Sequence, residues 1–252
     1  MSAALYLSRS GHKVTLSEKS DKLGGQFNLA WKAPGKQSMQ EGLDNLEYCV
    51  KANTESVILG RAVDANLIDE ISPDLLVWAT GAVQNIPEIK ELSSQYSMTS
   101  LEYFKGDKPV KGPRILVIGA GRTGVEIAEK LGTDGHEIVA TKRTDPIGSM
   151  MEMITKKLTM MRIDKLSNVT LMPHTTVKEF KTDSVVVEQD GERLTIEPFQ
   201  TVILSPGMLS ALSPDESIRK SVANLEVIGD AKQVKDIFSA VHAGYEVAQK
   251  YE

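Results

Sequence analysis

The chain has 252 residues, 41% of them hydrophobic and 25% charged, which is typical of a globular protein with one or two domains. Its net charge of −5 at pH 7 and its aromatic content of 5% argue against a nucleic-acid partner, because phosphate-binding surfaces are basic and base-stacking surfaces are aromatic. The single cysteine, Cys49, excludes an internal disulfide, a CxxC redox pair and a cysteine-based metal cage. Without a signal peptide or an apolar run long enough to span a bilayer, we predict a cytoplasmic protein with no membrane partner and no metal site.

The first half of the chain alternates helical and strand-like segments. Two segments have the apolar spacing of amphipathic helices, and three short apolar runs predict buried strands. The helices are residues 2–9 and 35–50, and the strands are residues 13–17, 56–59 and 75–79. Residues from about 84 to 111 are polar and contain prolines, and we interpret them as a crossing between domains.

The same order of elements starts again after residue 113. A buried strand at 114–118 leads through a glycine turn into a helix at 125–131 and a second strand at 136–141. The methionine-rich residues 150–163 predict an amphipathic helix whose methionines fill gaps in the core, with a soft binding face as the alternative. The remaining elements are four antiparallel strands between residues 169 and 196 with Asp190-Gly191 as a hairpin turn, buried strands at 201–204 and 225–228, and a helix at 234–251. This alternation predicts an α/β fold with parallel sheets covered on both faces.

The strongest local motif is Gly119-Ala120-Gly121-Arg122-Thr123-Gly124, which lies between a buried strand and a helix. In such a turn the first glycine permits a tight bend, the second lets the backbone approach a pyrophosphate, and the third lets helix and strand pack closely. Free amides and the dipole at the helix start then favour the phosphates. We therefore predict an NAD(P)-binding site at Gly119, Gly121, Arg122, Thr123 and Gly124, with a purely structural glycine turn as the alternative.

The end of the next strand indicates which nicotinamide cofactor binds. An acid there binds a ribose 2′-hydroxyl, whereas a basic residue accommodates a 2′-phosphate. Here Lys142 and Arg143 follow the strand, and an arginine can bind a phosphate through two hydrogen bonds. The pair favours NADP(H) over NAD(H), and a solvent-exposed basic pair is the alternative. Pro206 and Gly207, after the strand at 201–204, complete the predicted NAD(P) site.

A second set of strand ends in the outer parts of the chain predicts a flavin site. Glu18 follows one strand, where an acid can bind a ribose hydroxyl, and Gly24-Gly25-Gln26 comes soon after. Ala79-Thr80-Gly81 ends another strand. Asp230 follows the strand at 225–228, where a carboxylate can bind a ribityl hydroxyl of FAD. The predicted FAD-binding residues are Glu18, Lys19, Gly25, Gln26, Ala79, Thr80, Gly81, Gly229, Asp230 and Ala231.

Taken together, these residues resemble the C-terminal FAD- and NAD(P)-binding portion of the old yellow enzyme relatives that carry an iron–sulfur cluster. This is the group of 2,4-dienoyl-CoA reductase, 2-enoate reductase and trimethylamine dehydrogenase. The most similar run covers residues 11–30, and the Ala79-Thr80-Gly81, GxGxxG and Gly229-Asp230-Ala231 elements match in order. The resemblance implies two Rossmann-like domains of glutathione reductase type. The FAD-type domain would comprise residues 1–107 and 198–252, and the NAD(P)-binding domain residues 108–197.

The resemblance also implies that hydride passes from NADPH to FAD. Electrons then reach FMN in an iron–sulfur TIM-barrel domain, where the double bond of an enoate is reduced. This sequence contains neither the barrel nor the first strand and glycine-rich loop of the FAD-type domain, so we expect a truncated gene product or a partner that supplies them. We therefore predict an NAD(P)H-dependent flavin oxidoreductase module, with a non-catalytic nucleotide-binding subunit as the alternative. No side chain is nominated as a catalytic acid, base or nucleophile.

Overall fold

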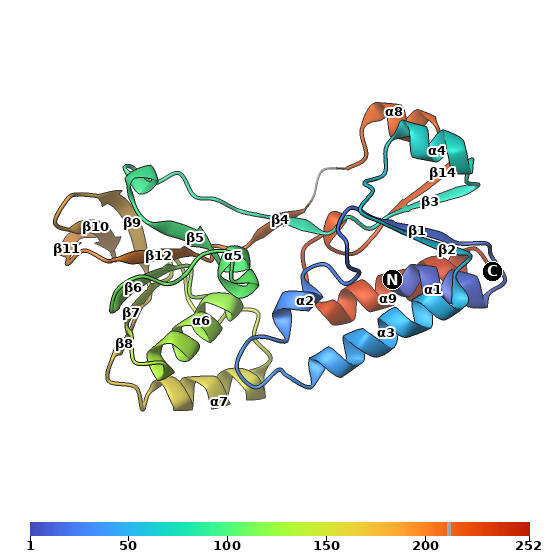
Figure 1. Cartoon of the computed structure of the whole chain (residues 1–252). Helices are drawn as coiled ribbons and strands as arrows, with labels where there is room; N and C mark the ends of the chain where they lie inside the picture. Colours follow the sequence, from blue (N-terminus) through green and yellow to red (C-terminus); the bar gives the residue numbers. More distant parts are fainter. Residues whose placement is uncertain (211–212) are drawn as a thin grey trace. The chain divides into compact units, whose positions relative to one another are not determined.

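The computed structural model describes residues 1–210 and 213–252, which divide into two compact units (Figure 1). Unit 1 comprises residues 1–31, 38–83 and 208–252, and unit 2 comprises residues 32–37 and 84–207. None of the helices in the described part of the chain has the length and hydropathy that a membrane span requires.

Unit 2 is built around a five-stranded parallel sheet with the strand order β5-β12-β6-β7-β8. A three-stranded antiparallel sheet with the order β11-β10-β9 accompanies it. The elements are η1 (Leu92–Ser94), β5 (Ser97–Thr99), α5 (Ser100–Lys105), β6 (Arg114–Ile118), α6 (Arg122–Thr133), β7 (Glu137–Thr141), α7 (Met153–Ile163), β8 (Val169–Met172), β9 (Thr175–Phe180), β10 (Val185–Gln189), β11 (Glu192–Ile196) and β12 (Thr201–Leu204).

The parallel sheet of unit 2 separates two cores, because successive side chains of a strand point to opposite faces. Leu116 and Ile118 of β6 pack in one cluster with Phe180 of β9 and Val187 of β10, so the antiparallel sheet covers this face. Helix α6 contacts β6, β7 and β8 and packs against α5 and α7, so these helices cover the other face of the sheet (Figure 1). Both faces of the sheet are therefore covered, as the near-continuous apolar sequence of its strands predicts.

Unit 1 contains two short parallel sheets, β1 with β2 and β3 with β14, surrounded by helices. A Cβ atom on Gly244 of α9 would lie 2.6 Å from the amide nitrogen of Ala3 in α1, so this glycine permits the two helices to cross closely. The elements are α1 (Ser2–Arg9), β1 (Thr15–Glu18), α2 (Phe27–Ala30), α3 (Met39–Asn53), β2 (Ser56–Leu59), α4 (Ala65–Ile71), β3 (Leu75–Trp78), β4 (Ala82–Gln84), β13 (Met208–Ser210), α8 (Glu216–Lys220), β14 (Asn224–Val227), η2 (Gly229–Ala231) and α9 (Ile237–Lys250).

The units are bounded differently from the domains expected at residues 1–107, 108–197 and 198–252. Boundaries lie at 31/32, 37/38, 83/84 and 207/208. The last two arise because β5 and β12 pair in the same parallel sheet as β6. Residues 84–111 are therefore more than a polar crossing. They contribute β5 and α5, with Met98 and Phe104 buried in unit 2.

Two finer expectations about unit 2 are wrong. Strand β8 runs parallel to β7, rather than antiparallel to its neighbours, and extends the main sheet. In α7, the side chains of Met153 and Met161 are 78% and 50% exposed, whereas Thr159 and Ile163 are buried. The exposed methionines of this helix therefore do not fill the core.

Candidate dinucleotide-binding site

The GxGxxG turn joins β6 directly to α6 at the carboxyl edge of the parallel sheet. The amides of Gly119 and Ala120 both donate to the carbonyl oxygen of Thr141, at 2.9 Å, which ties the turn to the end of β7. Gly119 has a φ of +106°, a left-handed conformation that favours glycine. Gly121 is the N-cap of α6, so the free amides and the positive end of the helix dipole lie at this turn.

The three glycines of the turn have different neighbours. A Cβ atom on Gly119 would lie 2.2 Å from the carbonyl oxygen of Ser205, and one on Gly124 would lie 2.0 Å from that of Gly119. At Gly121 the nearest atom would be the hydroxyl of Ser149, at 3.8 Å. The outer glycines are thus required for packing of this protein's own backbone, whereas the space beside Gly121 is open. This arrangement fits a dinucleotide whose diphosphate approaches the backbone at Gly121.

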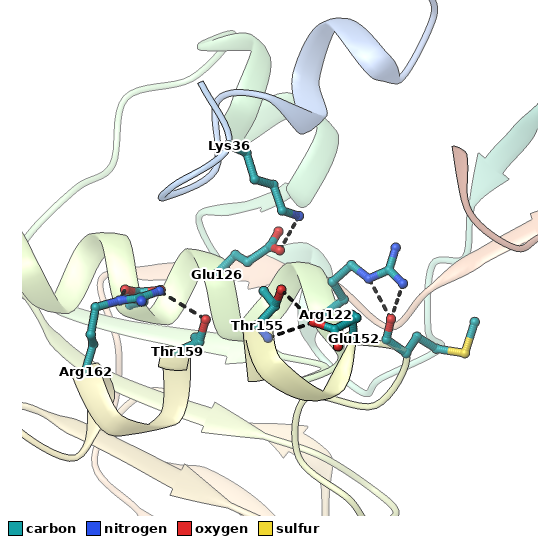
Figure 2. Close-up of polar contacts among 9 residues, drawn as sticks. Lys36, Arg122, Glu126, Glu152, Thr155, Thr159 and Arg162 are labelled. Carbon is teal, nitrogen blue, oxygen red and sulfur yellow. Dashed lines mark hydrogen bonds and ion pairs between the residues drawn. The ribbon is translucent and has the colours of Figure 1, made fainter. Parts of the chain in front are cut away.

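A loop from the end of β7 to α7 folds beside the turn. The amide of Gly148 donates to the carbonyl oxygen of Ala120 at 2.9 Å, and the Arg122 guanidinium donates to the carbonyl oxygen of Met150 (Figure 2). Arg122 therefore holds this loop in place, a role that the GxGxxG pattern does not predict. The hydroxyl of Ser149 lies near Gly121 and was also missed, because no spacing rule marks a serine on a connecting loop.

Two buried carboxylates fix α6 in unit 2. Glu126 pairs with Lys36, and Glu129 pairs with Arg162 of α7, whose Nη2 also donates to the hydroxyl of Thr159 at 3.1 Å (Figure 2). The side chains of both glutamates are only 7% exposed. These pairs hold the glycine turn indirectly, because they lie on the helix that begins at the turn.

The predicted basic pair lies immediately after β7, with an acid and a histidine beside it. Lys142 Nζ donates to the hydroxyl of Thr144 at 3.3 Å, and Arg143 is exposed. Asp145 Oδ2 lies 2.5 Å from Nε2 of His174, in the turn after β8. No local sequence pattern marks either partner, since Asp145 stands beyond the strand end and His174 is brought here only by the pairing of β7 with β8.

The last predicted NAD(P) residues follow β12. The φ of Gly207 is +109°, and its carbonyl oxygen accepts a hydrogen bond from the amide of Asn85 at 3.1 Å. Pro206 precedes it, and the Cα of Pro206 would be 2.8 Å from a Cβ atom on Gly119. The structure thus brings the predicted NAD(P) residues together at the carboxyl ends of β6, β7 and β12, the edge where open α/β sheets bind their ligands.

The predicted flavin residues of unit 1 also lie at carboxyl ends of parallel strands. Glu18 ends β1, and one of its carboxylate oxygens accepts a hydrogen bond from the amide of Ser20 at 2.9 Å. Burial lowers the pKa of the Met1 amino group, an effect that the charge of Glu18 opposes. Gln26 Nε2 donates to the carbonyl oxygen of Ala82 at 3.4 Å, which connects the loop after β1 to the segment after β3.

The other flavin candidates lie around the ends of β3 and β14. Gly81 and Gly229 have φ values of +77° and +57°, so both take turns that favour glycine. Asp230 Oδ1 accepts a hydrogen bond from the amide of Lys235 at 3.0 Å, and the side chain of Ala231 is buried. The exposed candidates are Lys19, Gly25, Ala79 and Thr80, and a Cβ atom on Gly25 would meet nothing within 4 Å. These residues leave polar groups and open backbone at the strand ends, which fits a flavin dinucleotide.

Comparisons with known proteins agree with this geometry. The chain is 28% identical over 246 residues to a bilirubin reductase of Mediterraneibacter gnavus, covering 97% of this chain and 38% of the relative. It is also 28% identical over 251 residues to an NADH oxidase of Thermoanaerobacter brockii, covering 98% of this chain and 39% of the relative. The chain therefore spans about two fifths of the length of these relatives.

The solved structure of a 2-naphthoyl-CoA reductase shares the fold, with a TM-score of 0.88 at 24% identity over 98% of this chain and 37% of that one. Residues 1–213 match the family model of the pyridine nucleotide-disulphide oxidoreductases. The resemblance found in the sequence and the expected two-dinucleotide α/β fold are thus confirmed. The chain belongs to the pyridine nucleotide-disulphide oxidoreductase family.

Proposed function

We propose that this chain is an NAD(P)H-dependent flavin oxidoreductase module that takes hydride from NADPH and delivers it to FAD. The observation that carries the proposal is the turn at Gly119 to Gly124, where the outer glycines are required for packing and the space beside Gly121 is left open. The family match, together with the bilirubin reductase and the NADH oxidase among the relatives, supports the same class of reaction. In this proposal the electrons then pass from FAD to a partner domain, which carries them to the final electron acceptor.

The residues of this chain contribute binding and orientation. We assign the diphosphate of the nicotinamide cofactor to the free amides at the start of α6, beside Gly121. The adenosine ribose would lie toward Lys142 and Arg143 after β7, and the nicotinamide toward Pro206 and Gly207 after β12. Hydride transfer itself is the chemistry of the two cofactors, which the protein orients and shields from water.

For the flavin, we assign Glu18 to the adenosine ribose and Asp230 to the ribityl chain, because a carboxylate accepts hydrogen bonds from hydroxyl groups. Lys19, Gly25 and Gln26 would line the loop after β1. Ala79, Thr80 and Gly81 would offer backbone groups after β3, as would Gly229 and Ala231 after β14. In this proposal FAD is the resident cofactor of unit 1, and unit 2 presents the nicotinamide cofactor.

A second candidate is a nucleotide-binding subunit without turnover. It is favoured by the division of the described parallel strands of unit 1 into two separate two-stranded sheets, β1 with β2 and β3 with β14. Such a unit offers a less continuous platform for a flavin dinucleotide than the five-stranded sheet of unit 2 offers for NADPH.

One experiment separates the two candidates. The purified full chain is mixed with FAD, freed of unbound flavin, and titrated with NADPH under anaerobic conditions. Retained flavin absorbance that bleaches in proportion to NADPH supports the oxidoreductase. NADPH binding without retained flavin supports the nucleotide-binding subunit, and the absence of NADPH binding contradicts both.

A further inference from the structure

The turn after β8 is tied to the end of β7 by two backbone hydrogen bonds. The amide of Lys142 donates to the carbonyl oxygen of Met172, and the amide of Thr175 donates to the carbonyl oxygen of Lys142, both at 2.9 Å. His174 stands between these two anchors, so its position relative to Lys142 is fixed by the sheet. The imidazole then reaches Asp145, on the segment that follows the basic pair, at 2.5 Å.

This contact lies at the carboxyl edge of the sheet, one strand beyond the basic pair. An extended dinucleotide with its diphosphate at the end of β6 places its adenosine half across the ends of the next strands, β7 and β8. Lys142, Arg143, Asp145 and His174 therefore gather where the adenosine ribose and its 2′ substituent would lie.

We propose that the Asp145–His174 pair tunes the selectivity of this chain between NADPH and NADH, making the charge around the adenosine ribose depend on pH. This inference rests on the proposed function, because it deepens the assignment of the same site. Histidine is the side chain whose charge ordinarily changes between about pH 5 and pH 8. When His174 is protonated, its positive charge offsets the negative charge of the Asp145 carboxylate. The two cations of Lys142 and Arg143 then attract a 2′-phosphate without opposition from Asp145. With His174 neutral, Asp145 repels that phosphate.

Further charged groups lie on β9, on β10 and in the turn after β10. Across β9 and β10, Lys178 pairs with Glu188 at 3.1 Å. In the turn after β10, the amide of Asp190 donates to the carbonyl oxygen of His174 at 3.3 Å, which places Asp190 beside this histidine. The side chains of His174 and Asp145 are 46% and 58% exposed, so their ion pair contributes little to stability and its removal leaves the fold intact.

The test compares dissociation constants of NADPH and NADH for the full wild-type chain and for His174→Gln. The constants are measured by titration calorimetry from about pH 5.5 to about pH 8.5 at low ionic strength. Because the 2′-phosphate of NADPH titrates near pH 6, the quantity of interest is the ratio of variant to wild type at each pH, in which the ligand's own titration cancels. His136→Gln, at the opposite end of β7, is the matched control.

We expect His174→Gln to weaken NADPH binding by roughly 3- to 10-fold at the acidic end and by less than about 2-fold at the alkaline end. NADH, which has no 2′-phosphate, should change by less than about 2-fold throughout. Asp145→Asn should tighten NADPH binding at alkaline pH by a similar factor, and His136→Gln should change neither cofactor.

A variant-to-wild-type ratio that stays constant with pH overturns the inference, as does an equal change for NADH and NADPH. Such a result would leave NADPH binding, and thus the proposed function, in place. If the wild-type chain binds neither nucleotide at any pH, the proposed function fails and the inference fails with it.

Discussion

Gly124 lies so close to Gly119 that a Cβ atom on Gly124 would stand 2.0 Å from the carbonyl oxygen of Gly119. Neither residue can move freely, because the amide of Gly119 is hydrogen-bonded to the carbonyl oxygen of Thr141 and Gly124 lies on the buried face of α6. A helix and a strand that meet this closely need glycine at the third position of the motif. At Gly121, one turn earlier, no such packing contact requires glycine, and the diphosphate proposed to bind there would supply the requirement instead.

We predict that Gly121→Ala separates binding from folding. Its added Cβ would contact only the Ser149 hydroxyl at 3.8 Å, so the thermal midpoint should match that of the wild type. The same methyl group would occupy the space assigned to the diphosphate, and we expect NADPH affinity to fall by at least about 10-fold through lost phosphate hydrogen bonds. Thermal unfolding and calorimetric titration measure the two effects. Unchanged NADPH affinity would place the diphosphate elsewhere.

The matching variant at the third glycine should behave in the opposite way. Gly124→Ala forces α6 away from β6, and overpacking of this kind should lower the free energy of unfolding by about 2–3 kcal/mol. Gly42→Ala is the control. Gly42 is a solvent-exposed residue within α3, and a Cβ atom there would meet nothing within 4 Å. That change should stabilise the chain by about 0.5–1 kcal/mol. Urea unfolding of the three proteins tests both values, and equal stability of Gly124→Ala and wild type would contradict the packing argument.

The glycine turn also shows which features the sequence was able to predict. A strand, a glycine turn, a helix and a second strand are local patterns, so Gly119 to Gly124 and the ends of β6 and β7 were located correctly. Pairing between distant strands is not a local pattern. Nothing in residues 97–99 or 201–204 indicates that they join the same sheet as β6, and the expected domain boundaries therefore differ from those of the units.

Long-range contacts account for the other residues that were missed. Glu126 and Glu129 have the sequence of a solvated helix face, yet both are buried because Lys36 and Arg162 reach them from distant segments. His174 joins the candidate site through the pairing of β8 with β7, about thirty residues away along the chain. Spacing rules indicate where a motif begins, whereas the partners of its side chains depend on tertiary pairing.

The basic pair after β7 should discriminate between the two nicotinamide cofactors. Replacing Lys142 and Arg143 together by Ala should weaken NADPH binding by about 10- to 100-fold, because charge-assisted hydrogen bonds to the 2′-phosphate are lost. NADH affinity should change by less than about 3-fold. Lys181→Ala, directly after β9, with Arg193→Ala in β11 removes the same charge elsewhere in unit 2 and serves as the control. Equal losses for both cofactors would remove the argument for a 2′-phosphate site.

The ion pair of Lys36 with Glu126 should matter for stability more than an exposed pair does. Lys36→Met leaves a carboxylate that is only 7% exposed without its cation, and we expect the free energy of unfolding to fall by about 2 kcal/mol. In the exposed pair of Lys220 with Glu216, the side chains are 74% and 82% exposed, and Lys220→Met should cost less than about 0.5 kcal/mol. Urea unfolding compares the two variants, and equal effects would show that burial of Glu126 has no energetic consequence.

The stability of the chain should fall at alkaline pH through Tyr103 in α5. Burial raises the pKa of Tyr103 from 10.0 to about 12, with a smaller contribution from Asp134. The folded state therefore favours the protonated phenol. The contribution of this phenol to the free energy of unfolding is fully present below about pH 10, where Tyr103 begins to ionise in the unfolded chain. It is lost as the pH approaches about 12. Because the ring is partly exposed, we expect a loss of about 1–2 kcal/mol rather than the full linkage value.

Tyr103→Phe removes the ionisable group and keeps the ring that packs edge-to-face against Phe104 at 5.1 Å. The difference in unfolding free energy between this variant and the wild type should therefore shift in favour of the variant between about pH 9 and about pH 11. Lysine deprotonation in the same range affects both proteins equally and cancels in the difference. Tyr48→Phe, at a side chain that is 73% exposed, should show no such shift. If the difference for Tyr103→Phe stays constant with pH, the phenol is not held in its protonated form by the fold.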